Sequence, residues 1–357
     1  MIAYMLIASL LLIVALELIS RRDELRHLHI TFEIDTELVE PGESAALRYT
    51  VHNTSRLPVL FSSLTLRLPG GVKVNEDEKW KKLHLSEDFT GQQVEHRFYL
   101  MPYGKFAGRT NITVDRRGLH ELGKWYLESG DLLGLSPYLR SGDIPVKLIC
   151  TAESAKVEEI DALGGLIGDI SVRRFINDDP TLIMGYRGYT GREAMKEISW
   201  LQTAKRNELT VRKSDFTTDR IAVIAVNMDE GNRADMDRAL SLTRAVCEQF
   251  ESAKVPYSVF SNGDLDIIPE GLGRKHLFFI QRKIGLSKLA GHYSFGSLLD
   301  KLSREKRGDV SVVIISPAPL DKYSAELKKF SKFVDREPII ICGGEHVDDE
   351  KNSRRAS

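Results

Sequence analysis

Residues 186–212 read YRGYTGREAMKEISWLQTAKRNELTVR, and no other stretch of the chain has so specific an order of residue types. It contains a Tyr-Arg pair, a Tyr-Thr-Gly-Arg-Glu turn, an Ile-Ser-Trp triplet and a Leu-Thr-Val-Arg segment. Thr190 and Glu193 have the spacing of a capping box, and apolar residues recur at helical spacing from Ala194 to Leu201. The stretch therefore predicts a short amphipathic helix followed by a strand.

The same residues resemble the signature of the bacterial family called domain of unknown function 58. The positions that carry the resemblance are Tyr186, Tyr189, Gly191, Ile198, Trp200, Leu209 and Arg212. Residues 115–140, DRRGLHELGKWYLESGDLLGLSPYLR, resemble a second glycine-rich element of that family. The resemblance implies a membrane-anchored protein with a von Willebrand factor A-like module, and it implies MoxR-type AAA+ ATPases as partners.

The composition excludes some classes of protein. The chain has 357 residues, with 50 basic and 51 acidic side chains and a net charge of -1. A balanced charge gives no general attraction to nucleic acid, so we expect no nucleic-acid partner. Cys150, Cys247 and Cys342 are far apart and form no CxxC pair, which argues against a disulfide framework or a zinc site.

The first residues have the composition of a membrane anchor. Residues 1–19, MIAYMLIASLLLIVALELI, are almost wholly apolar, and about 20 such residues cross a bilayer core. Arg21, Arg22 and Arg26 lie in the basic linker of residues 20–29. The sequence thus predicts a single-pass cell-membrane protein, held in the lipid bilayer, with its soluble domains in the cytoplasm. A cleaved signal peptide and a buried helix are the alternatives, and the reverse orientation would make a receptor-like ectodomain.

Residues 30–150 have the alternating pattern of β-strands with one buried face. Leu47, Tyr49 and Val51 alternate with polar residues, and Pro-Gly and Asn-rich turns separate the runs. Several short strands at close spacing predict an Ig-like β-sandwich.

The rest of the chain is divided into a connector with the signature (residues 151–218), an α/β domain (219–345) and a flexible tail (346–357). Continuous apolar runs predict buried parallel strands at residues 221–226, 257–260, 277–280, 312–315 and 339–342. Amphipathic helices are expected at residues 234–253, 297–304 and 320–334. The predicted fold class is an α/β and β multidomain protein, in which a von Willebrand factor A-like, doubly wound and mostly parallel sheet follows the sandwich.

A degenerate ion site is predicted after the first strand of that domain. The metal-binding members of the von Willebrand factor A class have Asp-x-Ser-x-Ser there, whereas this chain has Asn227-Met228-Asp229-Glu230-Gly231. Asn227 and Asp229 still offer oxygen ligands, so weak Mg²⁺ binding is one alternative. The favoured interpretation is that Asp229 and Asn232 turn the chain and cap the next helix, with no cofactor.

The signature has two alternative interpretations. Arginine and aromatic side chains anchor protein partners, so Arg187, Arg192 and Lys205 are candidate partner-binding residues. Alternatively the stretch is an internal clamp, in which Trp200 packs beneath the α/β domain while Arg187 and Arg212 pair with nearby carboxylates such as Glu193, Glu197 and Asp215. The clamp is the favoured interpretation for Trp200 and Ile198.

No hydrolase elbow, phosphate loop, zinc-protease motif or strand-linked dinucleotide motif occurs in the chain. The predicted function is therefore a membrane-anchored, non-enzymatic adaptor or scaffold. Through the resemblance, it would work with a MoxR-type AAA+ ATPase in the assembly or maturation of envelope or metal-dependent complexes. The alternative is a hydrolase-like enzyme with a site between the β-sandwich and the α/β domain.

Overall fold

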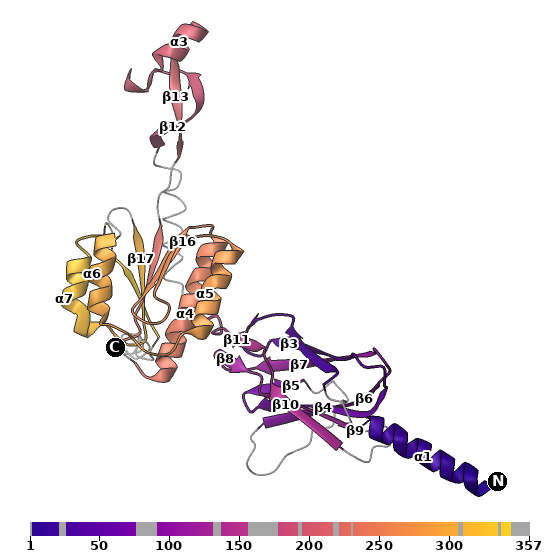
Figure 1. Cartoon of the computed structure of the whole chain (residues 1–357). Coiled ribbons are helices and arrows are strands. Elements are labelled where there is room, and N and C mark those ends of the chain that lie inside the picture. Colours follow the sequence, from indigo (N-terminus) through magenta and orange to yellow (C-terminus); the bar gives the residue numbers. More distant parts are fainter. Residues whose placement is uncertain are drawn as a thin grey trace, which may run out of the picture. The chain divides into compact units, whose positions relative to one another are not determined.

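The computed structural model divides the chain into two compact units, Met1–Glu153 and Ser154–Ser357. The residues it describes are 2–20, 26–75, 91–130, 137–155, 178–191, 195–216, 221–229, 231–305, 310–334 and 337–343. Figure 1 shows the elements of both units.

The N-terminal helix corrects the predicted localisation. Helix α1 (Ile2–Ser20) covers the apolar stretch. Among the described residues, however, no helix combines the length and the apolar character that a membrane crossing requires. The predicted single-pass transmembrane helix, and the cell-membrane localisation with cytoplasmic domains that was inferred from it, are therefore not supported.

The first unit contains a β-sandwich of two antiparallel sheets. One sheet has the order β1 (Leu28–Ile34), β3 (Ser44–Asn53), β7 (Lys105–Val114) and β5 (Val72–Val74). The other has the order β10 (Pro137–Asp143), β9 (Lys124–Gly130), β4 (Val59–Pro69) and β6 (Gly91–Leu100). A smaller sheet pairs β2 (Leu38–Val39), β11 (Lys147–Cys150) and β8 (Gly118–Glu121).

The two large sheets share one hydrophobic core, which the alternating pattern of β3 helps to form. Leu47, Tyr49 and Val51 are buried, as the period-two pattern predicted. Gly108 of β7 lies directly opposite Tyr49 in the register. A Cβ at Gly108 would overlap the Tyr49 ring. The missing side chain at position 108 therefore makes the space that the tyrosine ring occupies.

A histidine is buried in the same core. His96 of β6 is 2% exposed, and its ring meets the Tyr49 ring edge-on with the centroids 5.0 Å apart. Its Nε2 atom forms a short hydrogen bond with the Tyr49 hydroxyl. Burial disfavours the charged imidazolium and lowers the pKa of His96 to about 4. The sandwich is thus built around a neutral histidine.

The second unit contains a five-stranded sheet with helices on both faces. The strand order is β16 (Ile267–Gly271), β15 (Tyr257–Ser261), β14 (Ala222–Val226), β17 (Ser311–Ser316) and β18 (Ile339–Cys342). Helices α4 (Arg233–Ser252) and α5 (Arg274–Leu286) lie on one side in Figure 1, and α6 (Phe295–Glu305) and α7 (Ser324–Phe330) lie on the other. The short helix η3 (Asp321–Tyr323) precedes α7.

The apolar faces of α6 and α7 explain their position. Phe295 and Leu299 of α6 and Phe330 of α7 share a buried cluster with Val312 and Ile314 of β17. These helical residues recur at spacings that place them on one side of their helices. The helices therefore cover the sheet with their apolar faces.

The predicted fold class needs correction. Most strands of the described residues lie in small antiparallel sheets, so the chain is mainly a β protein. The run at residues 277–280, predicted to be a buried parallel strand, lies inside helix α5, and the strand beside β15 is instead β16, which is antiparallel. The predicted von Willebrand factor A-like doubly wound sheet is therefore not retained as the fold of this chain.

Candidate functional site

The signature residues form a hairpin with a helical insertion. Strand β12 (Asp178–Gly188) pairs with β13 (Thr210–Phe216), and Tyr186 lies opposite Arg212. The short helix η2 (Met195–Glu197) and helix α3 (Trp200–Arg206) lie between the two strands. Figure 1 shows α3 at the connected end of the strands.

The hairpin is irregular near its open end. The register shifts between Asp179 and Ile183 and again between Ile183 and Gly185. Pro180 lies in the first of these intervals, and a proline has no N–H to donate to the ladder. The regular pairing is thus concentrated at the end that carries α3.

Backbone hydrogen bonds close α3 onto the strand that follows it. The Ser199 N–H donates to the Thr210 carbonyl at 2.8 Å, and the Thr210 N–H donates to the Thr203 hydroxyl at 3.0 Å. Asn207, with φ of 55°, ends the helix in the left-handed region. Ile198 and Val211 are buried and form an isolated antiparallel bridge. These contacts fix how α3 presents its outer surface.

That outer surface carries large apolar side chains. Trp200 is 62% exposed and Leu201 is 68% exposed at the start of α3. Met195 before them and Leu209 after them are also exposed. Trp200 is exposed and so does not pack beneath the α/β domain as the clamp interpretation predicted, whereas Ile198 is buried beside Val211 of the hairpin itself. Several large apolar groups on so small a module are typical of an interaction surface.

Basic side chains accompany the apolar ones. Lys205 and Arg206 lie in the last turn of α3, where the partial negative charge of the helix end favours cations. Arg187 of β12 and Arg212 of β13 are exposed. The candidate Arg192 lies outside the described residues. The module thus combines an exposed tryptophan with positive charge, which is the composition of many protein-binding hot spots.

The remaining signature positions have a structural place. Tyr186 and Tyr189 are half-buried, and the Tyr189 N–H donates to the Leu209 carbonyl at 2.8 Å. Gly191 has φ of +87°, a conformation that residues with a Cβ rarely adopt. The helix does not begin at Thr190 as the capping-box spacing predicted. It begins after Ser199, and Glu193 lies outside the described residues.

The predicted ion-site residues lie at the carboxyl end of β14, where hydrogen bonds within the protein use their oxygens. The Asn227 Oδ1 atom accepts from the Asp229 N–H at 3.0 Å and from the Asn262 amide at 3.4 Å. The Asn227 amide in turn donates to the Ser316 hydroxyl at 3.1 Å. This arrangement joins the ends of β14, β15 and β17.

The Asp229 carboxylate is also engaged. Its Oδ2 atom accepts from the Tyr323 hydroxyl at 2.5 Å and from the N–H of Phe295, the first residue of α6, at 3.4 Å. Asn232 accepts from the Asp235 N–H at 2.9 Å and caps α4, which confirms that part of the prediction. Among the described residues, no group of three or more His, Cys, Asp and Glu side chains is placed to hold a metal. The bonds of Asn227 and Asp229 are those of a structural loop.

The likenesses of the chain to known proteins are distant. No family model matches the chain, and no curated protein matches it. A CARDB domain from Pyrococcus furiosus matches at 13% identity, over 35% of this chain and 94% of that chain, with a TM-score of 0.21. A cohesin module from a Clostridium perfringens glycoside hydrolase matches at 12% identity, over 34% and 96%, with a TM-score of 0.24. A human PapD-like domain matches at 13% identity, over 35% and 87%, with a TM-score of 0.20. At these identities and TM-scores, the similar structures say nothing about the function of this chain.

Proposed function

We propose that the chain is a non-enzymatic adaptor that binds a protein partner through the hairpin formed by β12, α3 and β13. The observation that carries the proposal is the exposure of Trp200 and Leu201 on a helix that backbone hydrogen bonds hold in place. A tryptophan side chain has few rotatable bonds, so it contributes a large contact area and loses little conformational entropy on binding.

The chemistry of the hairpin favours binding over catalysis. Residues 178–216 contain no histidine and no cysteine, so the usual neutral-pH base and the strongest nucleophile are both missing from this stretch. Lys205 and Arg206 give the exposed apolar surface a positive border. The partner surface that fits is apolar at its centre and acidic at its edge.

The family resemblance supplies a partner class to test, the MoxR-type AAA+ ATPases. The experiment measures binding of the full chain to a purified ATPase of this class by biolayer interferometry, with and without ATP. Trp200→Ala should weaken binding at least tenfold, because a central tryptophan at an interface typically contributes about 2 kcal/mol or more. Lys205→Glu should mainly slow association, and the effect should shrink as salt is raised.

The matched control is Phe279→Ala, which removes a 44% exposed aromatic side chain from α5. It should leave binding unchanged, and both alanine variants should keep the thermal midpoint of the parent chain. Equal binding by Trp200→Ala and the parent chain would overturn the hairpin site. If the chain does not bind the ATPase with ATP and also does not bind it without ATP, the ATPase is excluded as the partner.

A further inference from the structure

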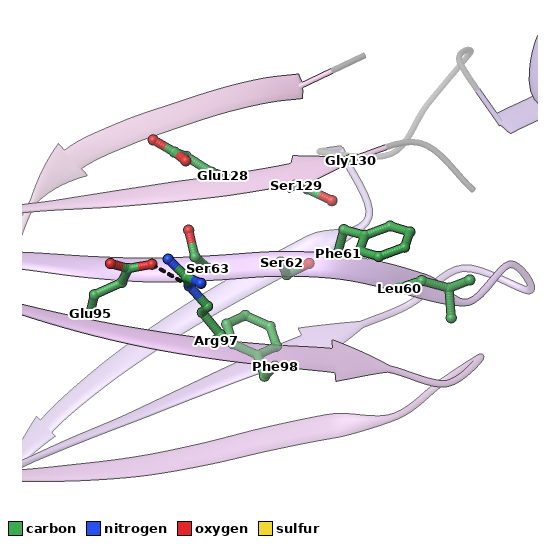
Figure 2. Close-up of a pocket in the computed structure, with 10 residues that line it drawn as sticks. All are labelled: Leu60, Phe61, Ser62, Ser63, Glu95, Arg97, Phe98, Glu128, Ser129 and Gly130. Carbon is green, nitrogen blue, oxygen red and sulfur yellow. Dashed lines mark hydrogen bonds and ion pairs between the residues drawn. The ribbon is translucent and has the colours of Figure 1, made fainter. Parts of the chain in front are cut away.

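A pocket of about 520 Å³ lies on the sandwich sheet formed by β10, β9, β4 and β6. It lies where the pairing of β4 with β6 shifts register, between Val59 and Ser62. An extra residue in one strand of an antiparallel pair bends that strand and redirects its side chains. Figure 2 shows Leu60 and Phe61 beside Ser62 on β4 at this place.

One part of the pocket is apolar. Leu60 is 39% exposed and Phe61 is 57% exposed, and both lie near the start of β4. Phe98 of β6 also lines the pocket and stacks on Phe106, with the ring centroids 4.3 Å apart and the planes at 5°. Phe106 belongs to β7 of the other sheet, so the Phe98 ring faces the core, and the exposed aromatic group of the pocket is Phe61.

Two buried hydroxyls line the same pocket. Ser62 of β4 and Ser129 of β9 are opposite each other in the register and are 4% and 2% exposed. Within the described residues, neither Oγ atom has a hydrogen-bond partner. A buried hydroxyl without a hydrogen-bond partner lowers the stability of the folded protein. Two such hydroxyls side by side are therefore uncommon where the residues serve packing alone.

The charges of the pocket are unbalanced. Arg97 Nε lies 2.7 Å from Glu95 Oε1, and this bond raises the pKa of Arg97. Figure 2 marks the bond with a dashed line. Ser63 of β4 lies opposite both Arg97 and Glu128 in the register, so it separates them by two strand spacings. In the part of the chain that the structure describes, the Glu128 carboxylate has no recorded hydrogen bond or ion pair. The pocket therefore has one uncompensated negative charge.

We propose that this pocket binds an extended peptide that carries a basic residue two positions away from an aromatic one. The basic group would lie at Glu128, and the aromatic group would pack against Phe61. Phe61 and Ser63 are two residues apart on β4, which is about 7 Å along the strand. Basic and aromatic residues at positions i and i+2 of an extended peptide have the same separation and point to the same side.

The pocket is independent of the hairpin, and the proposal does not rest on the adaptor function. A volume of this size lies within the range of specific ligand sites, roughly 300–1,000 Å³. Its net charge is negative, like that of an acidic ligand, so charge complementarity selects a cationic peptide over an anionic one.

The test uses the full chain, labelled with ¹⁵N, and the peptide Ac-Lys-Ala-Phe-NH₂ as probe. Saturable amide shifts confined to the pocket, at Ser62, Ser63 and Gly130, are expected at millimolar peptide. Ac-Glu-Ala-Phe-NH₂ and Ac-Lys-Ala-Gly-NH₂ should bind at least fivefold more weakly. Glu128→Gln should weaken binding of the lysine peptide at least fivefold and should leave the glutamate peptide unaffected or slightly improved.

The control variant is Glu33→Gln, an exposed carboxylate on β1 of the other sheet, which should bind like the parent chain. Phe61→Ala should weaken both phenylalanine peptides. Equal affinity for the acidic and basic peptides, equal affinity of Glu128→Gln and the parent, or shifts away from the pocket would each overturn the proposal. Shifts at the same amides that depend on protein concentration without peptide would instead assign the pocket to a second copy of the chain, and would also overturn it.

Discussion

Acidification should destabilise the β-sandwich through His96. The unfolded chain protonates a histidine near pH 6.5, whereas burial lowers the pKa of His96 in the folded chain to about 4. Because the folded pKa is the lower one, the stabilising effect is fully present above pH 6.5. It is lost as the pH falls toward 4, since the unfolded state then binds a proton that the folded state does not.

The magnitude follows from the difference between the two pKa values. A difference of one unit between the folded and unfolded pKa corresponds to about 1.4 kcal/mol. The free energy of unfolding should therefore fall by roughly 3 kcal/mol between pH 6.5 and pH 4 from His96 alone. His96→Gln keeps a polar group that can meet the Tyr49 hydroxyl but does not titrate. The variant should lose this part of the pH dependence and keep the part that carboxylates contribute.

The assay is urea unfolding at several pH values, with hydrogen exchange of the β3 segment measured by mass spectrometry so that the sandwich is followed separately from the second unit. For each protein, the free energy of unfolding is plotted against pH. The contribution of His96 is the slope of this plot for the parent chain minus the slope for His96→Gln. NMR titration of the His96 ring gives the folded pKa directly. A ring that titrates near pH 6.5, or equal slopes for the two proteins, would refute the reasoning.

Three further outcomes are expected. Gly123→Ala should lower the free energy of unfolding by about 1–3 kcal/mol, because Gly123 has φ of +84° and a Cβ would meet the Arg67 carbonyl oxygen; a thermal midpoint equal to that of the parent chain would contradict this. Asn232→Ala should cost about 1 kcal/mol through the lost bond to the Asp235 N–H, and Asn232→Ser should restore most of it in chemical denaturation. Cys247 is fully buried, and burial together with nearby carboxylates raises its thiol pKa, so iodoacetamide should modify it only after unfolding; labelling of the native chain, detected by peptide mass spectrometry, would contradict the burial.

Local patterns predicted the strands better than their assembly. The alternation at Leu47, Tyr49 and Val51 identified the buried face of β3, because a period of two has one structural meaning. The four-residue apolar run at residues 277–280 has no such unique meaning, since a buried strand and one side of a helix look alike over that length. The run belongs to helix α5, which continues through polar residues at both ends.

The candidate sites show a similar limit. Sequence order identified the residues of the hairpin, but whether Trp200 is buried depends on how α3 closes onto β13, which no spacing reveals. The sandwich pocket was missed altogether. It depends on the pairing of Ser62 with Ser129, which are distant in the chain, and on a register shift between β4 and β6. Only the folded sheet brings these groups together.

The space that Gly108 leaves for the Tyr49 ring links the tolerated substitutions at the two positions. A chain that acquired alanine at position 108 would need a smaller residue at position 49 before the sheet could close again. Across divergent homologues, the two positions should therefore change as a pair, with each intermediate that changes only position 108 selected against. Coupled replacement at positions 49 and 108 would therefore be a direct consequence of the contact between the Tyr49 ring and the Gly108 backbone.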